Sequence, residues 1–212
     1  MDWNGWHDEY DRPGSRLARR LAVVQERVRA ALDAAPGGPV RVISMCAGQG
    51  RDVIPVLAGH PRRADVRARL VELDPRNCEV ARAAAAAHGL DQVEVVAGDA
   101  ALTGGYAGLA PAGLVLACGI FGNVTDEDVR RTIGFFPRLC ASGGRVIWTR
   151  HREEPDLVPR MCGWFEEDGF ELEWVSEPGA GYGVGVHRFT GTPLPLEGTE
   201  RMFRFVGYDR LR

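Results

Sequence analysis

Three short segments of the sequence carry groups suited to binding a small polar ligand. The segment Ala47-Gly48-Gln49-Gly50 has little side-chain bulk, so a ligand can lie against bare backbone there. Glu72 and Asp99 carry carboxylates, which accept hydrogen bonds from hydroxyl and amino groups. Each of the three follows a short apolar run, and such runs are typical of buried strands. The sequence therefore predicts three binding groups at the ends of three strands.

Strands and helices alternate along most of the chain. Strands are expected at 40–45, 68–74, 93–97, 113–118, 145–149, 170–175 and 182–189. Helices are expected over 16–32, with Ser15 as the cap, and at 51–58, 76–88, 126–140 and 156–167. This alternation predicts a doubly wound α/β fold with a mostly parallel sheet and helices on both faces. Ligands of such sheets bind beyond the carboxyl ends of the strands, where the three groups are expected to meet.

Composition narrows the class of protein. A chain of 212 residues with a net charge of -3 suits one α/β domain and gives no basis for nucleic-acid binding. The five cysteines form no C-x-x-C pair, so neither a zinc site nor a disulfide framework is expected. No apolar run approaches the ~20 residues of a membrane helix, and no secretory leader is evident. We expect a soluble, cytoplasmic protein that binds no membrane or metal; the oligomeric state stays open, with a homodimer as one option.

The arginine pairs 19–20, 62–63 and 130–131 are interpreted as solvated faces.

The strand followed by small-x-Gly-x-Gly resembles the first motif of the class I S-adenosylmethionine (SAM)-dependent methyltransferases, and the resemblance extends over 40–150. It implies a seven-stranded sheet with an antiparallel edge hairpin, and SAM as the cofactor. Glu72 would then accept the ribose hydroxyls, Leu73 would pack on the adenine, and Asp99 would accept the exocyclic amine. N–H groups of the helix after the turn would face the methionyl carboxylate. The cofactor residues implied are Ser44, Cys46, Ala47, Gly48, Gly50, Glu72, Leu73, Asp99, Ala100 and Cys118.

Departures from the motif leave alternatives open. Ser44 stands where the family usually has an acid, and Cys46 where it usually has its first glycine. Asp74 is a second candidate for the ribose acid, although a helix-start role suits it better. A nicotinamide-dependent oxidoreductase competes, but its G-x-G-x-x-G/A fingerprint would require a small residue in place of Val53. A SAM- or nucleotide-binding module without catalysis is the other alternative.

The sequence gives fewer signals for the residues that would bind the methyl acceptor. Phe121 and Asn123 follow the fourth strand, and Arg150 and His151 follow the fifth. The segment Gly119-Ile120-Phe121-Gly122 does not match the N/D-P-P-Y/F signature of nucleic-acid amino-methylating members, which favours methylation of O or N in a small molecule. We expect His151, His7 and Tyr10 as catalytic candidates, and Trp6, Phe121, Asn123 and Arg150 as substrate-binding residues.

Residues 1–35 are expected to form an aromatic segment and helix ahead of the SAM-binding domain, 36–212. The aromatic residues Trp3, Trp6 and Tyr10 suggest a lid over the site, or ordinary packing on the first helix. His151 has an alternative as a surface histidine beside Glu153, and His187 is expected to be structural.

Overall fold

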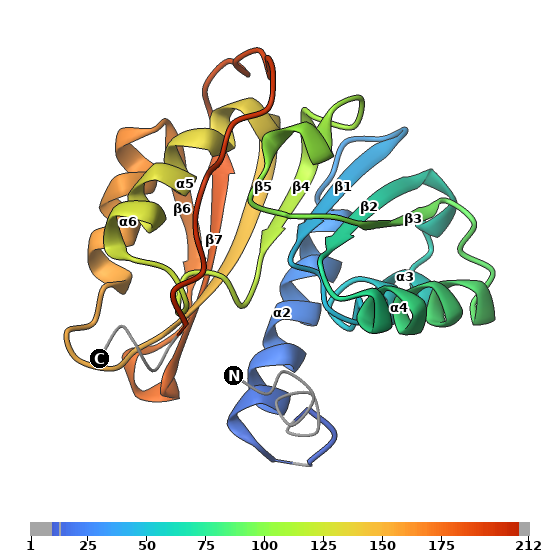
Figure 1. The fold of residues 1–212 in the computed structure, drawn as a ribbon, viewed down its shortest axis with the longest axis horizontal. Helices are drawn as coiled ribbons and strands as arrows, with labels where there is room; N and C mark the ends of the chain where they lie inside the picture. The colour runs from blue at the N-terminus through green and yellow to red at the C-terminus, as the bar shows by residue number, and fades with distance from the viewer. Residues whose placement is uncertain (1–9, 13, 208–212) are drawn as a thin grey trace.

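The computed structural model describes residues 10–12 and 14–207, which form a single seven-stranded sheet (Figure 1). The strands are β1 (Val40–Met45), β2 (Val66–Glu72), β3 (Val93–Ala97), β4 (Ala112–Ala117), β5 (Cys140–His151), β6 (Phe170–Val175) and β7 (Tyr182–Phe189). Their order is β3-β2-β1-β4-β5-β7-β6, and only β7 runs antiparallel to its neighbours. The predicted doubly wound fold with an antiparallel edge hairpin is confirmed.

In the described part of the chain, five α-helices cover the two faces of the sheet: α2 (Arg16–Asp33), α3 (Ile54–Gly59), α4 (Pro75–Ala87), α5 (Asp126–Leu139) and α6 (Val158–Glu167). Apolar side chains of α2, α3 and α4 share one core cluster, and those of α5 and α6 share the other (Figure 1). Met202 and Phe203, from the chain after β7, are fully buried in the second cluster. Each face of the parallel strands is therefore removed from water, as their continuous apolar character requires.

Short polar side chains start three of the helices at the predicted places. The Ser15 hydroxyl accepts the N–H of Ala18 at 2.9 Å, and a carboxylate oxygen of Asp74 accepts that of Arg76 at 2.9 Å. Thr125 caps α5 in the same way. A capping bond satisfies one of the backbone donors that have no partner in the first helical turn, at about 1 kcal/mol each. The helix starts of α2, α4 and α5 are thus local properties of the sequence.

The turn after β1 differs from the prediction. The helix expected from residue 51 begins at Ile54. Residues 51–53 form a turn, in which the Gly50 carbonyl accepts the N–H groups of Val53 and Ile54, at 3.2 and 2.9 Å. Gly50 itself serves packing, since a Cβ there would lie 2.6 Å from Ile54 Cδ1 and 2.8 Å from Leu70 Cδ2. Glycine is therefore needed at position 50, where the turn packs against Leu70 of β2. The fifth strand also starts earlier than expected, at Cys140.

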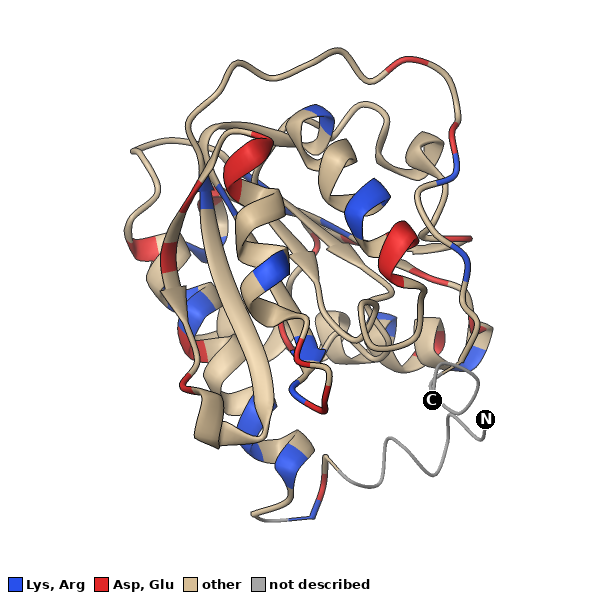
Figure 2. Cartoon of the chain, turned by 90° about the vertical axis from the view of Figure 1, so that its left-hand side faces the viewer, with Lys and Arg blue, Asp and Glu red and all other residues tan. Residues whose placement is uncertain are grey.

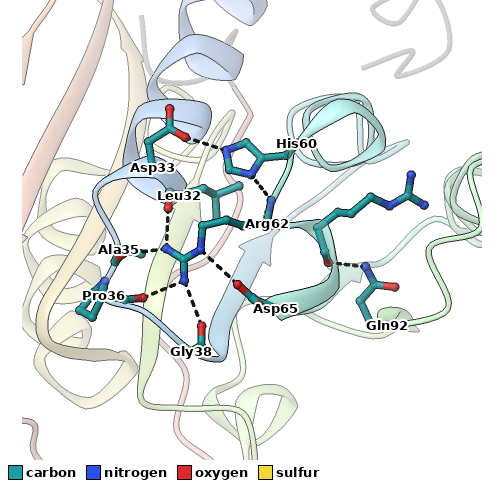
Figure 3. A network of polar contacts seen from close by, with 10 residues as sticks. Leu32, Asp33, Ala35, Pro36, Gly38, His60, Arg62, Asp65 and Gln92 are labelled. Atoms are coloured by element: carbon teal, nitrogen blue, oxygen red, sulfur yellow. Dashed lines mark hydrogen bonds and ion pairs between the residues drawn. The ribbon is translucent and has the colours of Figure 1, made fainter.

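The arginine pair 62–63 is not a solvated face, whereas Arg19 and Arg131 are exposed as predicted. The Arg62 guanidinium donates to the carbonyls of Leu32, Ala35, Pro36 and Gly38 and pairs with Asp65 (Figure 3). It thereby satisfies carbonyls at the C-terminal end of α2 and fixes the connection to β1. His60 Nε2 lies 3.2 Å from Asp33 beside it (Figure 3). Arg130 and Arg131 are likewise engaged, with Asp168 and Asp128.

Charges of both signs lie interspersed over the helices and loops in the view of Figure 2, with no single-sign face there. Among the residues that the structure describes, no helix is both long and apolar enough to cross a membrane.

Candidate cofactor and active site

A cavity of about 740 Å³ lies at the carboxyl ends of β1, β2, β3 and β4. Its volume is in the range of small-molecule and cofactor sites. Helix α2 closes one side with Arg20, Leu21 and Val24. Nine of the residues predicted for the site line this cavity: Tyr10, Cys46, Ala47, Gly48, Glu72, Leu73, Asp99, Ala100 and Cys118. The three segments that the sequence singled out therefore meet in one hollow.

Glu72 joins two of these segments. One of its carboxylate oxygens accepts the Gly48 N–H at 2.8 Å, and the other accepts the Asp74 N–H at 2.8 Å. The residue is 9% exposed, so its orientation is fixed by burial as well as by these bonds. Each carboxylate oxygen has a second lone pair, so the group can still accept two hydroxyl donors from a ligand. The Asp74 carboxylate is instead occupied by the backbone and guanidinium of Arg76, consistent with its helix-start role.

Asp99 is held in a similar way at the end of β3. Its Oδ1 accepts the Ala101 N–H at 2.9 Å, and its Oδ2 lies 2.9 Å from the Arg201 guanidinium. Next to Glu72 in the chain, the Leu73 side chain also borders the cavity and is 70% exposed. Covering a large apolar side chain with a flat apolar ligand surface is favourable, at about 25 cal/mol per Å².

The two positions that depart from the family motif behave differently. Cys46 takes the left-handed conformation, with φ at 50°, which explains why the family usually has glycine there. Burial raises the pKa of the Cys46 thiol well above its usual range, and the nearby carboxylates of Glu72 and Asp99 raise it further. Burial does the same for Cys118, so both thiols stay neutral and are poor nucleophiles. Ser44 is fully buried in β1, and neither it nor Gly50 lines the cavity.

Asp52 is the main lining residue that the sequence analysis missed. It is 8% exposed and lines the cavity, yet its Oδ1 has no hydrogen-bond partner among the described residues. Burial raises the pKa of this carboxyl to about 6. An acid two residues after the glycine turn is usually part of a helix start, so sequence alone gave no reason to expect it in the cavity. Arg20, Gln49, Arg51, Thr149 and Phe205 line the cavity and were also missed.

Three of the predicted substrate-binding residues, Phe121, Asn123 and Arg150, do not line the cavity. Phe121 is fully buried and packs edge-on against Phe136 in the core. Arg150 is 8% exposed because its guanidinium donates to the Phe121 carbonyl and pairs with Asp126. The Asn123 amide donates to the Gly119 carbonyl at 2.9 Å, so its role in the structure is to shape a loop.

Of the catalytic candidates among the described residues, Tyr10 lines the cavity and His151 does not. His151 is half-buried away from the cavity lining, and its Nδ1 accepts the Glu153 N–H at 3.3 Å. Tyr10 lines the cavity, and its hydroxyl accepts a hydrogen bond from Arg20 at 3.1 Å. The remaining candidates, Trp6 and His7, and the proposed lid residue Trp3 lie outside the described residues.

His187 has the structural role predicted for it. The residue is fully buried, and its Nδ1 accepts the indole N–H of Trp148 at 3.0 Å. Its ring stacks on Phe165 with the centroids 4.2 Å apart, and burial lowers the pKa of the imidazole to about 4.

Comparison with known proteins identifies the fold. Solved structures similar to the chain include an O-methyltransferase family protein from Burkholderia thailandensis, with a TM-score of 0.65 and 19% identity over 82% of this chain and 56% of that one. The CurJ carbon methyltransferase gives a TM-score of 0.69 and 13% identity over 90% of this chain and 59% of that one. The glycopeptide N-methyltransferase MtfA, complexed with SAM, gives 0.58 and 15% over 79% of this chain and 94% of that one.

The chain thus spans less than three fifths of the length of the first two structures, and these identities carry the fold alone. No curated protein sequence matches it. A family model described as "Putative methyltransferase" matches residues 12–159, which is more than half of the chain. The chain therefore belongs to that methyltransferase family and has the class I methyltransferase fold.

Proposed function

We propose that this protein transfers a methyl group from SAM to an oxygen or nitrogen of a small-molecule acceptor. One observation carries the proposal: Glu72, Leu73 and Asp99 border a single cavity beside the bare turn at Gly48. Two acceptors and an exposed apolar side chain in one cavity match the donors and the flat face of an adenosine. The SAM-bound glycopeptide N-methyltransferase with the same fold supports this choice of ligand.

The adenosine would lie across the ends of β2 and β3. Glu72 would accept the two ribose hydroxyls through the lone pairs that Gly48 and Asp74 leave open. Leu73 would cover one face of the adenine, and Asp99 would accept its exocyclic amine. In these roles the carboxylates keep the contacts that now fix them, so binding requires little rearrangement of the chain.

The amino-acid end of SAM would lie toward α2. The N–H groups of Val53 and Ile54, at the start of the following helix, are already bonded to the Gly50 carbonyl. Arg20 and Arg51 are the cations in this part of the lining, and Asp52 is its buried acid. We assign the ammonium group to Asp52, because a buried carboxylate with an unpartnered oxygen is stabilised by a cationic donor.

Bound SAM supplies a methyl group on a positively charged sulfur, and the protein's task is to orient the acceptor. Orientation contributes ~7–11 kcal/mol, and a general base only about 3–5 kcal/mol. Tyr10, Thr149 and Phe205 border the cavity, as do Cys118 and Gly119 after β4, and we place the acceptor among them. Burial raises the pKa of Tyr10, which keeps its hydroxyl protonated at neutral pH and suits it to binding more than to proton abstraction.

The oxidoreductase alternative finds little support in the turn. Val53, at the third small position of a dinucleotide fingerprint, is 1% exposed and packed in the core under α3. A branched side chain there keeps helix and strand further apart than the fingerprint's glycine does.

Calorimetric titration tests the cofactor, and methyl transfer tests the reaction. We expect binding of SAM and of S-adenosylhomocysteine, and none of NAD or NADP. Isotope-labelled SAM incubated with a metabolite extract should transfer its label to a small acceptor. Absence of SAM binding would overturn the proposal, and binding without transfer to any acceptor would leave the non-catalytic alternative.

A further inference from the structure

The chain after β7 forms a long strap across one face of the sheet. We use this name for residues 190–207, which lie outside the family match at 12–159 (red in Figure 1). The strap first meets the end of α5, where the Leu194 N–H donates to the Pro137 carbonyl at 2.9 Å. It then runs beside the loop after β3, with Leu102 and Arg201 in an antiparallel bridge.

The strap is attached by hydrogen bonds to two of the loops that border the cavity, those after β3 and β4. Beside the loop after β3, Thr103 N–H donates to the Glu200 carbonyl at 2.9 Å, and Met202 N–H donates to the Ala101 carbonyl at 2.8 Å. At the loop after β4, the Val206 N–H donates to the Asn123 carbonyl at 2.9 Å. Met202 and Phe203 are fully buried between these points, so the strap is a fixed part of the fold.

Two strap side chains reach the binding site from this path. The Arg201 guanidinium lies 2.9 Å from Asp99 Oδ2, and both side chains are about one-third exposed, at 38% and 35%. Phe205 lines the cavity itself. The strap, which the family model does not cover, therefore contacts Asp99 through Arg201 and lines the cavity with Phe205.

We infer that the strap belongs to the binding site and that Arg201 is a positioning residue, which holds the Asp99 carboxylate in place for an amino-substituted purine. The inference rests on the proposed function, because it takes Asp99 as the acceptor for the adenine amine. With Ala101 on one oxygen and Arg201 on the other, the carboxylate is held at both of its atoms. The lone pairs that remain are then directed by the protein before any ligand arrives.

Without Arg201, Asp99 keeps only the Ala101 contact, and its second oxygen becomes free to rotate and to be hydrated. Ordering it again on binding then costs affinity. The contribution of a partly exposed pair is small, so we expect Arg201→Ala to weaken binding about three- to tenfold. Loss of the acceptor itself, in Asp99→Ala, is expected to weaken binding about tenfold or more.

The test is a double-mutant cycle on the full chain, with S-adenosylhomocysteine as the calorimetric probe. Wild type, Arg201→Ala, Asp99→Ala and the double variant are compared, with Arg204→Ala as a matched arginine on the same strap. We expect the Arg201→Ala loss to disappear in the Asp99→Ala background, because the arginine acts through that acid. Arg201→Lys should recover part of the loss, and Arg204→Ala should bind as wild type does. Should Arg201→Ala not fold, Arg201→Gln takes its place in the cycle.

A second ligand tests separately the contact between Asp99 and the exocyclic amine of the purine. In the counterpart of S-adenosylhomocysteine with unsubstituted purine, a hydrogen atom replaces the amine, so Asp99 has no donor to accept. Arg201→Ala should therefore leave the affinity for this ligand unchanged. Wild-type affinity for S-adenosylhomocysteine in Arg201→Ala, additive losses in the cycle, or equal losses with both ligands would each overturn the inference. If the wild type binds neither ligand, the proposed function fails instead.

Discussion

At the scale of single residues, Glu72 shows how one side chain can shape a turn and present a binding group. Its two oxygens bond the backbone on opposite sides of the cavity, at Gly48 and Asp74. A buried carboxylate is costly unless hydrogen-bonded, and these two N–H donors supply that compensation. The same bonds fix the direction of the lone pairs that remain for a ligand. Structure and function thus depend on one group here.

Replacing Glu72 by glutamine should therefore weaken both binding and stability. The amide has one oxygen, so one of the two N–H donors would face an NH₂ group. We expect S-adenosylhomocysteine affinity to fall about tenfold or more, and the free energy of unfolding to fall by about 1–3 kcal/mol. Calorimetry and urea denaturation measure the two quantities.

Asp74→Asn is the matched control for Glu72→Gln. Asparagine caps a helix as well as aspartate does, so α4 should be retained and the affinity should stay near the wild-type value. The opposite ranking, with Asp74→Asn the weaker binder, would make Asp74 the ribose acid.

At the scale of elements, two side chains hold neighbouring segments in place, one by hydrogen bonds and one by packing. Arg62 ties the connection between α2 and β1 to the segment after α3. In the β5–β7 pairing Trp148 is opposite Gly185, where the indole occupies the space that a side chain would fill. Each contact can be tested without touching the cavity.

Arg62→Lys should lower the free energy of unfolding by about 2–3 kcal/mol. Lysine keeps the charge but cannot spread donors over four carbonyls in the planar arrangement of a guanidinium. Arg67→Lys, at an exposed position of β2, provides the control and should change stability by less than about 0.5 kcal/mol. Equal effects of the two substitutions in urea denaturation would show that the network around Arg62 contributes no stability.

Gly185→Ala should also be destabilising, by about 1–3 kcal/mol. A Cβ at this position would lie 2.2 Å from Trp148 Cζ2, and the indole is held by its stacking on Phe165 and its bond to His187. Gly179→Ala, with no heavy atom near its added Cβ, should be nearly neutral. Thermal melting of the two variants compares them directly.

The elements were largely predictable because their signals are local. Caps at Ser15 and Asp74, and apolar runs of strand length, fixed the helix starts and the alternation that defines the sheet. Groups directly after a strand, such as Glu72 and Asp99, were predicted because parallel strands bring their ends to one edge.

The rest of the site could not be predicted because it depends on contacts between distant segments. Asp52 lines the cavity from the turn before α3, which begins at Ile54 and not at residue 51 as predicted. Arg201 and Phe205 come from a strap whose path has no periodic signal. The placement of Phe121 and Arg150 was wrong for a related reason, since packing against α5 and Asp126 turns both side chains away from the cavity.

At the scale of the whole molecule, two buried groups give stability opposite dependences on pH. The pKa of His187 is lowered by burial from 6.5 to about 4. The unfolded chain therefore binds a proton that the folded chain does not between those values, and stability falls as the pH falls through them. The pKa of Asp52 is raised by burial from 3.8 to about 6. Here the folded chain holds the extra proton, so stability falls as the pH rises from 4 to 6.

The two effects should nearly cancel in the wild type between pH 4.5 and 6, since shifts of this size each correspond to about 3 kcal/mol. Asp52→Asn removes one of them, so its free energy of unfolding should rise with pH across this range and exceed that of the wild type at pH 7.5. His187→Gln removes the other, so its stability should fall with rising pH, whatever its absolute value. Urea denaturation of the three proteins at pH 4.5, 6 and 7.5 measures these slopes. Parallel pH profiles for the wild type and Asp52→Asn would mean that burial does not raise the pKa of Asp52 in the folded chain.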